Sequence, residues 1–217
     1  MIKKNTYWKN IKICGIKDST TLDCCQKNNV NFYGLVFYNK SPRNISIESA
    51  SKLINYQTNS NIIPVGIFSN HNINEVCRII KKLNLKYIQL HGNENNTYIS
   101  KLKDKFSVKI IKAIGIKLKN DLEKVNMYSN ADFYLFDYKP NKNELPGGNA
   151  KSFDWSFLKN INIDKPWFIS GGINIGNIDE ILNNLIPYGI DISSGVEDLP
   201  GIKNSKKITE MANTINV

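Results

Sequence analysis

The sequence predicts a (β/α)8 barrel, and three observations lead to this fold class. Short apolar runs rich in Ile, Val, Phe and Tyr alternate with segments of helical period along the chain. There are eight such runs, and a candidate helix follows each one, as in a (β/α)8 barrel. No composition break or linker divides the 217 residues, so we expect one domain over residues 1–217. A doubly wound sheet is the structural alternative, although it rarely needs eight evenly spaced parallel strands.

Each expected strand is short and apolar, as strands buried on both faces of a parallel sheet are. The expected strands are Ile11–Cys14, Phe32–Phe37, Ile62–Phe68, Tyr87–Leu90, Lys109–Ile114, Phe133–Phe136, Trp167–Ser170 and Gly189–Ser193. Between the strands, apolar residues recur with helical period, and Ser46 and Asn72 are suited to cap helix N-termini. The expected helices begin near Ser19 and Ser46 and then span Ile73–Leu83, Asn95–Lys105, Leu118–Tyr128, Trp155–Leu158, Ile178–Leu185 and Ser205–Thr214. Tyr138–Ser152 is the longest expected loop.

The formal net charge of +10 raises the question of a nucleic-acid partner. The lysines are spread along the whole chain, and they never form a block of roughly five or six like charges. No RNP, KH, zinc-finger or helix-turn-helix pattern is present. We therefore interpret the charge as compositional drift together with attraction for anionic substrates, and expect no nucleic-acid partner. A basic barrel that binds nucleic acid is the non-enzymatic alternative, and a salt-sensitive gel shift would support it.

No apolar run approaches the roughly 18 residues that a membrane span needs, so we expect no membrane partner. The N-terminal residues are basic but lack an apolar stretch of secretory length. The four cysteines form no CxxC pair and have no His-rich partner segment. These features predict reduced thiols in a cytoplasmic protein without a metal site.

Residues suited to chemistry gather at the carboxyl ends of the expected strands, where active sites of this barrel lie. Glycines let backbone N–H groups approach phosphate oxygens, and serine hydroxyls add small donors. Such residues follow the seventh and eighth expected strands, at Gly171, Gly172, Ser193, Ser194 and Gly195. Together they predict a phosphate site, to which residues 147–151 add a third wall.

Cys14 ends the first expected strand and precedes a glycine. Most free cysteines are small buried hydrophobes, but a strand end at the barrel mouth would leave this thiol accessible. Lys12 is two residues before Cys14, so its side chain points to the same face of the expected strand. A nearby ammonium lowers a thiol's pKa toward neutrality, which would make Cys14 a usable base. Cys24, Cys25 and Cys77 fall in helical segments, and we interpret them as structural.

Asp137 ends the apolar run of the sixth expected strand, where a carboxyl group tends to have a raised pKa that suits a general acid. The alternative is a carboxylate that caps the following loop. Arg43 in a loop would bind a carboxylate or phosphate through two donors, and His91 would donate to a substrate oxygen. The alternative for both Arg43 and His91 is a side chain that is simply solvated or caps a helix.

Eight segments, in order along the chain, resemble the phosphoribosylanthranilate isomerase family of tryptophan biosynthesis. They are IKICGI (11–16), GLVFYNKSPRNIS (34–46), PVGIFSN (64–70), IQLHGNE (88–94), FDYK (136–139), PGGNAKSFDW (146–155), ISGGINIGNI (169–178) and GIDISSGVEDLPGIKNSKKI (189–208). They cover nearly the whole chain, and KICG, SPR, QLHG, FDW and SSGVE-x-x-PG-x-K together are highly specific.

The resemblance implies an aldose–ketose isomerase that carries out an Amadori rearrangement. Its substrate would be N-(5-phosphoribosyl)anthranilate, and its product 1-(2-carboxyphenylamino)-1-deoxyribulose 5-phosphate. The matching positions imply Cys14 as the general base and Asp137 as the general acid. Arg43 and His91 resemble the family's substrate-positioning residues, and Asp191 resembles an aspartate near the anthranilate moiety.

The resemblance also implies the phosphate contacts, the cofactor requirement and the partners. The phosphate groups fall on Gly148, Gly171, Gly172, Ser193, Ser194 and Gly195. No cofactor is expected, because the iminium intermediate is itself the electron sink. The expected partner is the small-molecule substrate, and both a monomer and a homodimer are compatible with a barrel surface.

Two departures from the family pattern lie near the site. Ala150 stands where the family often has a further glycine, which narrows the backbone freedom of this loop. Tyr138 follows Asp137, where the family often has a small hydroxyl residue. Related barrels, such as an indole-glycerol-phosphate synthase or a sugar-phosphate epimerase, are the enzymatic alternatives. The first would need lysine and glutamate catalysts and the second metal-binding His and Asp, and the strand-end Cys and Asp disfavour both.

Overall fold

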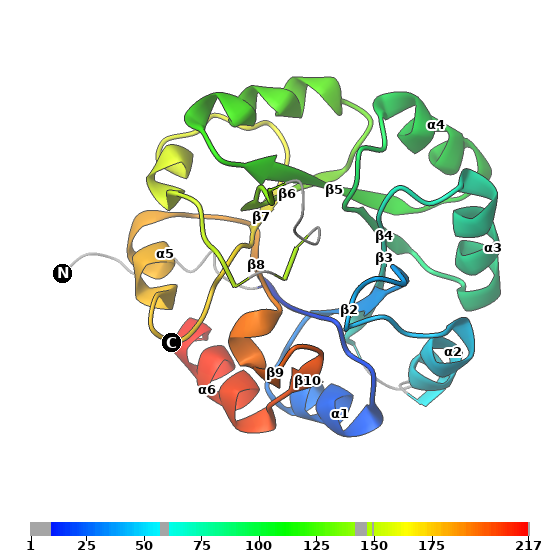
Figure 1. Cartoon of the computed structure of the whole chain (residues 1–217), viewed down its shortest axis with the longest axis horizontal. Helices are drawn as coiled ribbons and strands as arrows, with labels where there is room; N and C mark the ends of the chain where they lie inside the picture. The colour runs from blue at the N-terminus through cyan, green and yellow to red at the C-terminus, as the bar shows by residue number, and fades with distance from the viewer. Residues whose placement is uncertain (1–9, 57–60, 142–146, 149, 217) are drawn as a thin grey trace.

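The structure is a computed structural model that describes residues 10–56, 61–141, 147–148 and 150–216. Eight parallel strands close into a barrel, in which β1 pairs with both β2 and β8 (Figure 1). The strands are β1 (Asn10–Cys14), β2 (Phe32–Val36), β3 (Ile63–Phe68), β4 (Tyr87–Leu90), β5 (Lys109–Ile116), β6 (Phe133–Tyr138), β7 (Trp167–Ile169) and β8 (Gly189–Ile192). The predicted (β/α)8 barrel is confirmed, and the doubly wound alternative is wrong because the sheet is closed.

Helices form a ring around the barrel (Figure 1). The α-helices are α1 (Ser19–Lys27), α2 (Ile47–Tyr56), α3 (Ile73–Leu83), α4 (Asn96–Lys105), α5 (Ile178–Asn184) and α6 (Ser205–Ile215). Both expected caps form, since the Ser46 hydroxyl accepts from the Ser49 N–H at 3.1 Å and the Asn72 side chain accepts from the Asn74 N–H at 2.9 Å. Among the helices described, none has the length and apolar character needed to cross a membrane.

The segment after β5 differs from the expected helix over 118–128, because η1 (Lys119–Met127) is a 3₁₀ helix. Of its residues only Leu122 is buried, so the segment has no continuous apolar face to hold a longer helix against the barrel. The Asp121 carboxylate accepts from the N–H groups of Lys117 and Leu118, which tightens the first turn. A second 3₁₀ helix, η2 (Trp155–Leu158), has the expected bounds.

Side chains of the strands alternate between the barrel interior and the layer beneath the helices, as strand geometry requires. Along β1, Ile11 and Ile13 join the core between sheet and helices, whereas Cys14 packs against the interior cluster. The interior cluster consists of Phe32, Val36, Val65, Ile67, Ile111, Ala113, Leu135 and Phe168. The same alternation directs the last inward residue of each strand toward the mouth of the barrel.

Aromatic side chains close the opposite end of the barrel interior. The rings of Phe32 and Tyr87 lie 5.5 Å apart, and those of Phe133 and Tyr188 lie 5.2 Å apart. Phe168 contacts Phe32 edge to face at 5.7 Å. These rings lie at or near the amino ends of their strands, so they fill the bottom of the barrel and leave the polar end as the place for a ligand.

A short antiparallel hairpin follows β8 and was not among the expected elements. After the 3₁₀ turn η3 (Ser194–Val196), β9 (Glu197–Leu199) pairs with β10 (Ile202–Lys203). Gly201 lies in the connecting turn with a φ of +83°, in the left-handed region that favours glycine. The hairpin places Glu197 and Lys203 next to one another at the barrel mouth.

Candidate active site

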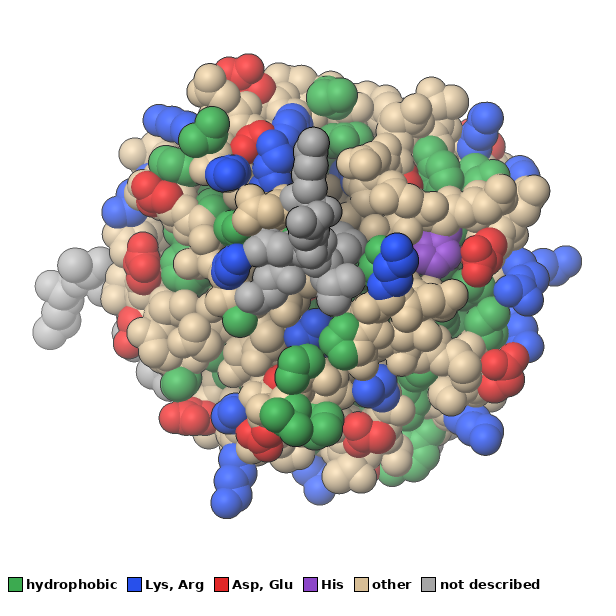
Figure 2. Space-filling model, viewed as in Figure 1, with side chains coloured by type: hydrophobic (Ala, Val, Ile, Leu, Met, Phe, Trp, Pro, Cys, Tyr) green, Lys and Arg blue, Asp and Glu red, His purple; other side chains and the backbone are tan. Residues whose placement is uncertain are grey.

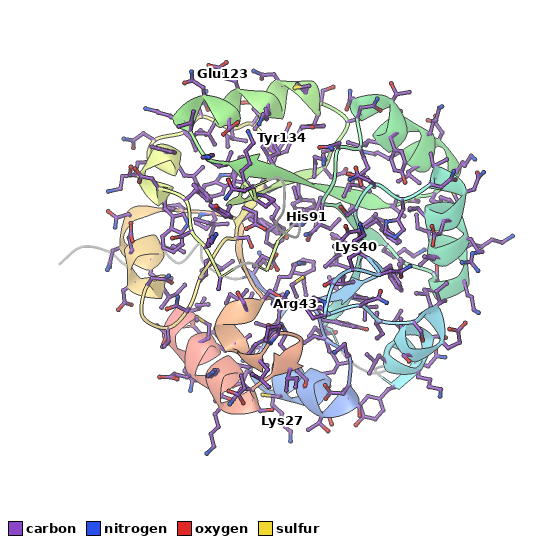
Figure 3. All side chains as sticks on the ribbon, in the orientation of Figure 1. Lys27, Lys40, Arg43, His91, Glu123 and Tyr134 are labelled. Carbon is purple, nitrogen blue, oxygen red and sulfur yellow. The ribbon has the colours of Figure 1, made fainter. Side chains whose placement is uncertain are left out.

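The predicted catalytic and substrate-positioning residues meet in a single cavity at the carboxyl ends of the strands. The cavity is lined by Cys14, Arg43, His91, Asp137 and Asp191, among other residues. Figure 3 shows Arg43 and His91 near the centre of the ring, whereas Lys27 and Glu123 lie at its rim. Residues far apart in the sequence therefore come together because each lies near the carboxyl end of a barrel strand or in the loop that follows one.

A second cavity adjoins the first, and five of the six predicted phosphate residues line it, all but Gly195. It is lined by Gly148, Gly171, Gly172, Ser193 and Ser194, among other residues. Both cavities share Asp137 and Asp191 in their linings. Asn149, in the expected third wall, lies outside the described residues.

Lys12 and Asp191 form a buried ion pair beneath Cys14. The Lys12 ammonium donates to Asp191 Oδ1 at 2.7 Å, and neither side chain is more than 4% exposed. Burial opposes the charge on Lys12, but Asp191 and the neighbouring thiol outweigh it, so the pKa of Lys12 lies above its ordinary value. The pair therefore places a fixed positive charge next to the Cys14 thiol.

The expected depression of the Cys14 pKa does not occur in the free protein. Burial raises the pKa of this thiol, and Asp191 adds to the rise, although Lys12 and Lys203 oppose it. Because the Lys12 ammonium is already neutralised by Asp191, its effect on the thiol is smaller than that of an unpaired lysine. The sequence pattern could place Lys12 beside Cys14 but could not show this pairing.

Hydrogen-bond donors face both oxygens of the Asp137 carboxyl group. The N–H of Tyr138 donates to Oδ1 at 2.8 Å, so the larger residue at position 138 supplies a backbone donor despite the missing hydroxyl. The His91 Nε2 lies 3.2 Å from Oδ2. Gln89, which sequence reasoning did not single out, places its amide nitrogen 2.8 Å from the other ring nitrogen of His91. The predicted substrate-positioning histidine thus contacts the predicted acid.

Arg43 is held by a carboxylate that sequence reasoning also missed. Its Nε and Nη2 donate to the two oxygens of Glu197 at 2.8 and 2.6 Å, and Nη2 also approaches the Gly148 carbonyl at 3.4 Å. Lys203 donates to Glu197 at 2.7 Å. Burial tends to raise the pKa of Glu197, but these two cations lower it below its ordinary value. The motif SSGVE-x-x-PG-x-K contains both new residues, and the opposite charges across its turn were the available signal.

The glycines of the phosphate region allow three loops to pack against one another. Gly172 has a φ of +66°, and a side chain there would lie 2.7 Å from the backbone of Lys151. A side chain at Gly195 would overlap the carbonyl oxygen of Ile173. Ser193 links the region to β1, since its hydroxyl donates to the Cys14 carbonyl at 3.1 Å. These glycines are therefore needed for the packing of the loops, whether or not they also let a phosphate approach the backbone.

The first turn of η3 begins at Ser194, directly beside this region. N–H groups at the start of a helical turn have no partner within the turn, and they favour anions. Among the described residues, no group of three or more His, Cys, Asp or Glu side chains is arranged to hold a metal ion.

Ala150 adopts a φ of +54°, in the left-handed region that is costly for a residue with a Cβ. The departure from the glycine pattern noted in the sequence therefore imposes strain on this loop. We expect Ala150→Gly to stabilise the protein by up to about 1 kcal/mol, since relief of strain exceeds the added entropy of the unfolded chain. Thermal unfolding should show a midpoint raised by about 2–4 °C, and an unchanged or lower midpoint would contradict the strain.

Charged side chains surround the mouth without forming a patch of one sign. On the face shown in Figure 2, lysines and arginines are interspersed with aspartates and glutamates around the rim. The described part of this face therefore carries no continuous basic stripe of the kind that follows a nucleic-acid backbone.

Comparison with protein families places the whole barrel in a known group. Residues 11–214 match the family model described as N-(5′-phosphoribosyl)anthranilate (PRA) isomerase. A relative named N-(5′-phosphoribosyl)anthranilate isomerase from Rhizobium etli is 36% identical over 208 residues, which cover 95% of this chain and 93% of that protein. The protein of the same name from Paramagnetospirillum magneticum is 34% identical over 200 residues, which cover 91% of this chain and 93% of that protein.

Solved structures agree with this grouping. Phosphoribosyl anthranilate isomerase from Thermotoga maritima is similar with a TM-score of 0.85 and 28% identity, over 95% of this chain and 98% of that one. A phosphoribosyl anthranilate isomerase in complex with reduced 1-(o-carboxyphenylamino)-1-deoxyribulose 5-phosphate is similar with a TM-score of 0.80 and 26% identity, over 95% and 97% of the two chains.

Proposed function

Because the chain belongs to the N-(5′-phosphoribosyl)anthranilate isomerase family, we propose that it catalyses the Amadori rearrangement of N-(5′-phosphoribosyl)anthranilate in tryptophan biosynthesis. The product is 1-(2-carboxyphenylamino)-1-deoxyribulose 5-phosphate. The observation that carries this proposal is the common cavity of Cys14 and Asp137, with glycines and serines of the β7 and β8 loops beside it. A proton donor, a proton acceptor and an anion site are the parts that this reaction needs.

The reaction begins at Asp137, which protonates the ribose ring oxygen. The C1′–O4′ bond breaks, and the anthranilate nitrogen supplies its electron pair to form an iminium ion. The Cys14 thiolate then removes the proton from C2′, and the electrons of that C–H bond neutralise the iminium as an enolamine. The enolamine then tautomerises to the ketone, as C1′ takes a proton from water and the C2′ hydroxyl gives one to water. Exchange with water also restores the proton of Asp137 and removes that of Cys14. The proton count is thus unchanged overall, as an isomerisation requires.

The surroundings of the two groups support these roles. The Lys12 charge stabilises the Cys14 thiolate more than the thiol, so it favours the form that acts as a base. The donors at both oxygens of Asp137 stabilise the carboxylate that remains after proton transfer. The first effect increases the fraction of Cys14 that is ready to act as a base, and the second stabilises a charge that develops on Asp137 during the reaction, which lowers the barrier.

Arg43 is suited to bind the carboxylate of the anthranilate group. Glu197 occupies its Nε and Nη2, which fixes the guanidinium in one orientation at the cavity wall. Its Nη1 then serves as the donor for the substrate. Asp191, in its ion pair with Lys12, lies in the same cavity and would contact the nitrogen side of the anthranilate moiety.

The phosphate is proposed to bind in the second cavity, against the backbone of the β7 and β8 loops. Ser193 and Ser194 offer hydroxyl or backbone donors, and Gly148, Gly171 and Gly172 line the same cavity. Gly195, which follows Ser194 in η3, completes the proposed contacts. The start of η3 at Ser194 adds backbone N–H donors beside the same cavity.

Gly172→Ala is expected to raise KM for the phosphorylated substrate by about tenfold and to lower kcat much less. The added Cβ displaces the Lys151–Ser152 backbone or the β7 loop, and it therefore disturbs a group that binds substrate and transition state alike. Gly176→Ala, in the loop after β7, is the matched control, because the nearest atom to its Cβ is a side-chain oxygen 3.2 Å away. Steady-state kinetics on both variants check this result. A large loss of kcat at unchanged KM in Gly172→Ala would contradict the phosphate assignment.

The purified protein tests the proposed function directly. Addition of the protein to N-(5′-phosphoribosyl)anthranilate should abolish the fluorescence of the substrate, with formation of the carboxyphenylamino ketose phosphate identified by mass and NMR. Spontaneous breakdown would release free anthranilate, so the two fates are distinguished by the product. Absence of the ketose at high protein concentration would refute the proposal.

We further propose that the chain works as one domain in the cytoplasm, as a monomer or homodimer. Its four cysteines are free thiols, as expected where the environment is reducing. One similar structure, 27% identical, is described as monomers generated from the dimeric phosphoribosylanthranilate isomerase of Thermotoga maritima. Sedimentation of this protein at micromolar concentration would distinguish its two possible states.

A further inference from the structure

Gln89 lies on the inner face of β4, where its register partners on both neighbouring strands are aliphatic. It pairs in register with Ile67 of β3 and Ile111 of β5, and it is only 1% exposed. A buried amide in such surroundings is costly unless its donors and acceptor are used. Gln89 also lines the catalytic cavity, two residues before His91.

The contact between Gln89 and His91 determines which ring nitrogen of His91 carries the proton. The Gln89 amide nitrogen lies 2.8 Å from His91 Nδ1. An amide nitrogen only donates, so Nδ1 accepts, and the proton of the neutral ring is then on Nε2. Nε2 faces Asp137 Oδ2 at 3.2 Å, and it therefore donates to that carboxylate.

The opposite orientation of the amide is less favourable. In the observed orientation the Gln89 carbonyl oxygen is buried without a hydrogen-bond partner among the described residues. Turning the amide by 180° would bury two N–H donors at that position, and an orphaned donor is tolerated less well than an orphaned carbonyl. It would also leave His91 Nε2 as an acceptor facing the ionised Asp137. The network is consistent only with the Nε2–H tautomer whenever Asp137 is a carboxylate.

We propose that Gln89 is a positioning residue that sets the tautomer of His91 and thereby maintains a proton donor on Asp137. The proposal rests on the proposed function, in which Asp137 becomes a carboxylate as it protonates the ribose ring oxygen. Tyr138 already donates to Oδ1, and His91 supplies the matching donor at Oδ2 only while Gln89 donates to Nδ1. The pair of Gln89 and His91 thus stabilises the negative charge that develops on Asp137 in the transition state. Loss of the Gln89 donor therefore affects kcat more than KM.

The histidines can be read separately by NMR, because the chain has only two. His71 is an internal reference with the same tautomer, since the Ser69 N–H donates to its Nδ1 at 3.1 Å and its Nε2 lies 3.0 Å from the Phe37 carbonyl. Long-range ¹⁵N–¹H spectra of the imidazole groups, recorded on the full chain, report the tautomer of each ring.

Two variants and one control test the proposal. Gln89→Leu removes the donor with little change in volume, and Gln89→Glu replaces it with a carboxylate that accepts from Nδ1–H. Ile111→Val, at the register position of β5 that pairs with Gln89, alters the packing beside Gln89 while both Gln89 and His91 are kept. Thermal unfolding of each variant verifies that it is folded before the kinetics are compared.

The expected result has a spectroscopic and a kinetic part. His91 should be the Nε2–H tautomer in the parent protein, should lose that preference in Gln89→Leu, and should carry its proton on Nδ1 in Gln89→Glu. The kcat of both variants should fall roughly 10- to 100-fold with KM within about twofold, as when one preorganised donor is lost. His71 should be unchanged in all spectra, and Ile111→Val should retain the His91 tautomer and kcat.

Three outcomes would overturn the proposal. They are an Nδ1–H tautomer of His91 in the parent protein, an unchanged kcat in Gln89→Leu, and a lower kcat with an unchanged tautomer. Failure of the parent protein to convert phosphoribosylanthranilate is a different result, because it overturns the proposed function while the NMR spectra still decide the tautomer.

Discussion

Replacement of Cys14 by alanine is expected to lower kcat by about 10²- to 10⁴-fold, the usual contribution of a positioned proton-transfer group. Cys14 ends β1 at the wall of the catalytic cavity, and in the proposed reaction it removes the C2′ proton. Alanine fits the same strand position, so folding should change little. Binding of reduced 1-(o-carboxyphenylamino)-1-deoxyribulose 5-phosphate, the reduced product analogue, should change little as well. Steady-state fluorescence kinetics and thermal unfolding measure the two parts of this prediction. A variant with near-normal kcat would show that another group is the base.

The other three cysteines are the controls for this experiment. Cys24 and Cys25 lie on α1 and Cys77 on α3, away from the cavity. Their replacement by alanine should leave kcat unchanged, although Cys25→Ala removes a fully buried side chain and should lower thermal stability. A loss of kcat in one of these variants, without unfolding, would contradict the assignment of Cys14 as the only reacting thiol.

The pH dependence of the parent protein follows from the burial of Cys14. Burial raises the pKa of this thiol, so in the free protein at neutral pH most of it is protonated. The thiolate is the active form of a base, and its fraction increases as the pH approaches the raised pKa from below. We therefore expect kcat/KM to rise from neutral into alkaline pH. A profile that falls steadily above pH 7 would contradict a thiolate base with a raised pKa.

Asp137→Asn is expected to lower kcat by a similar factor of about 10²- to 10⁴-fold, because the amide cannot protonate the ribose ring oxygen. The amide oxygen can still accept from the Tyr138 N–H. Its nitrogen, however, faces His91 Nε2–H when it occupies the place of Oδ2, so the contact between these residues should lengthen. Binding of the reduced product analogue should be retained, and calorimetry would measure it.

Asp179→Asn is the matched control for Asp137→Asn. Asp179 is exposed in the first turn of α5, so the same chemical change there should leave kcat and KM unaltered. If Asp137→Asn retained more than about a tenth of the parent kcat, the ring oxygen would be protonated by another acid.

The eight strands were predictable because each is an apolar run bounded by polar or glycine residues. Tyr87–Leu90 matches the bounds of β4, and the other expected strands overlap the observed ones with shifts of one or two residues. Side-chain parity along β1 correctly directs Cys14 toward the barrel interior, and strand order then places it in one cavity with Asp137. The candidate site could thus be assembled from local patterns and the rule for this fold.

The contacts that tune the site could not be predicted in the same way. Glu197 meets Arg43 only because an unforeseen hairpin folds back over the mouth, and the two residues are 154 positions apart in the chain. Gln89 appeared as an ordinary polar residue in an apolar run, and its role depends on the distance to His91 Nδ1. The pKa of Cys14 depends on the balance between burial and a lysine that is already paired with Asp191. Each of these depends on tertiary geometry and not on local sequence.

A crystal structure of this protein with reduced 1-(o-carboxyphenylamino)-1-deoxyribulose 5-phosphate would decide whether the substrate binds at the barrel mouth in the proposed orientation. We expect the phosphate to lie against Gly172 and the start of η3, and the reduced C2′ to contact Cys14 Sγ. We also expect the anthranilate carboxylate to bind Arg43. An analogue bound outside this mouth, or bound in reverse with its phosphate on Arg43, would contradict the proposed arrangement of the site.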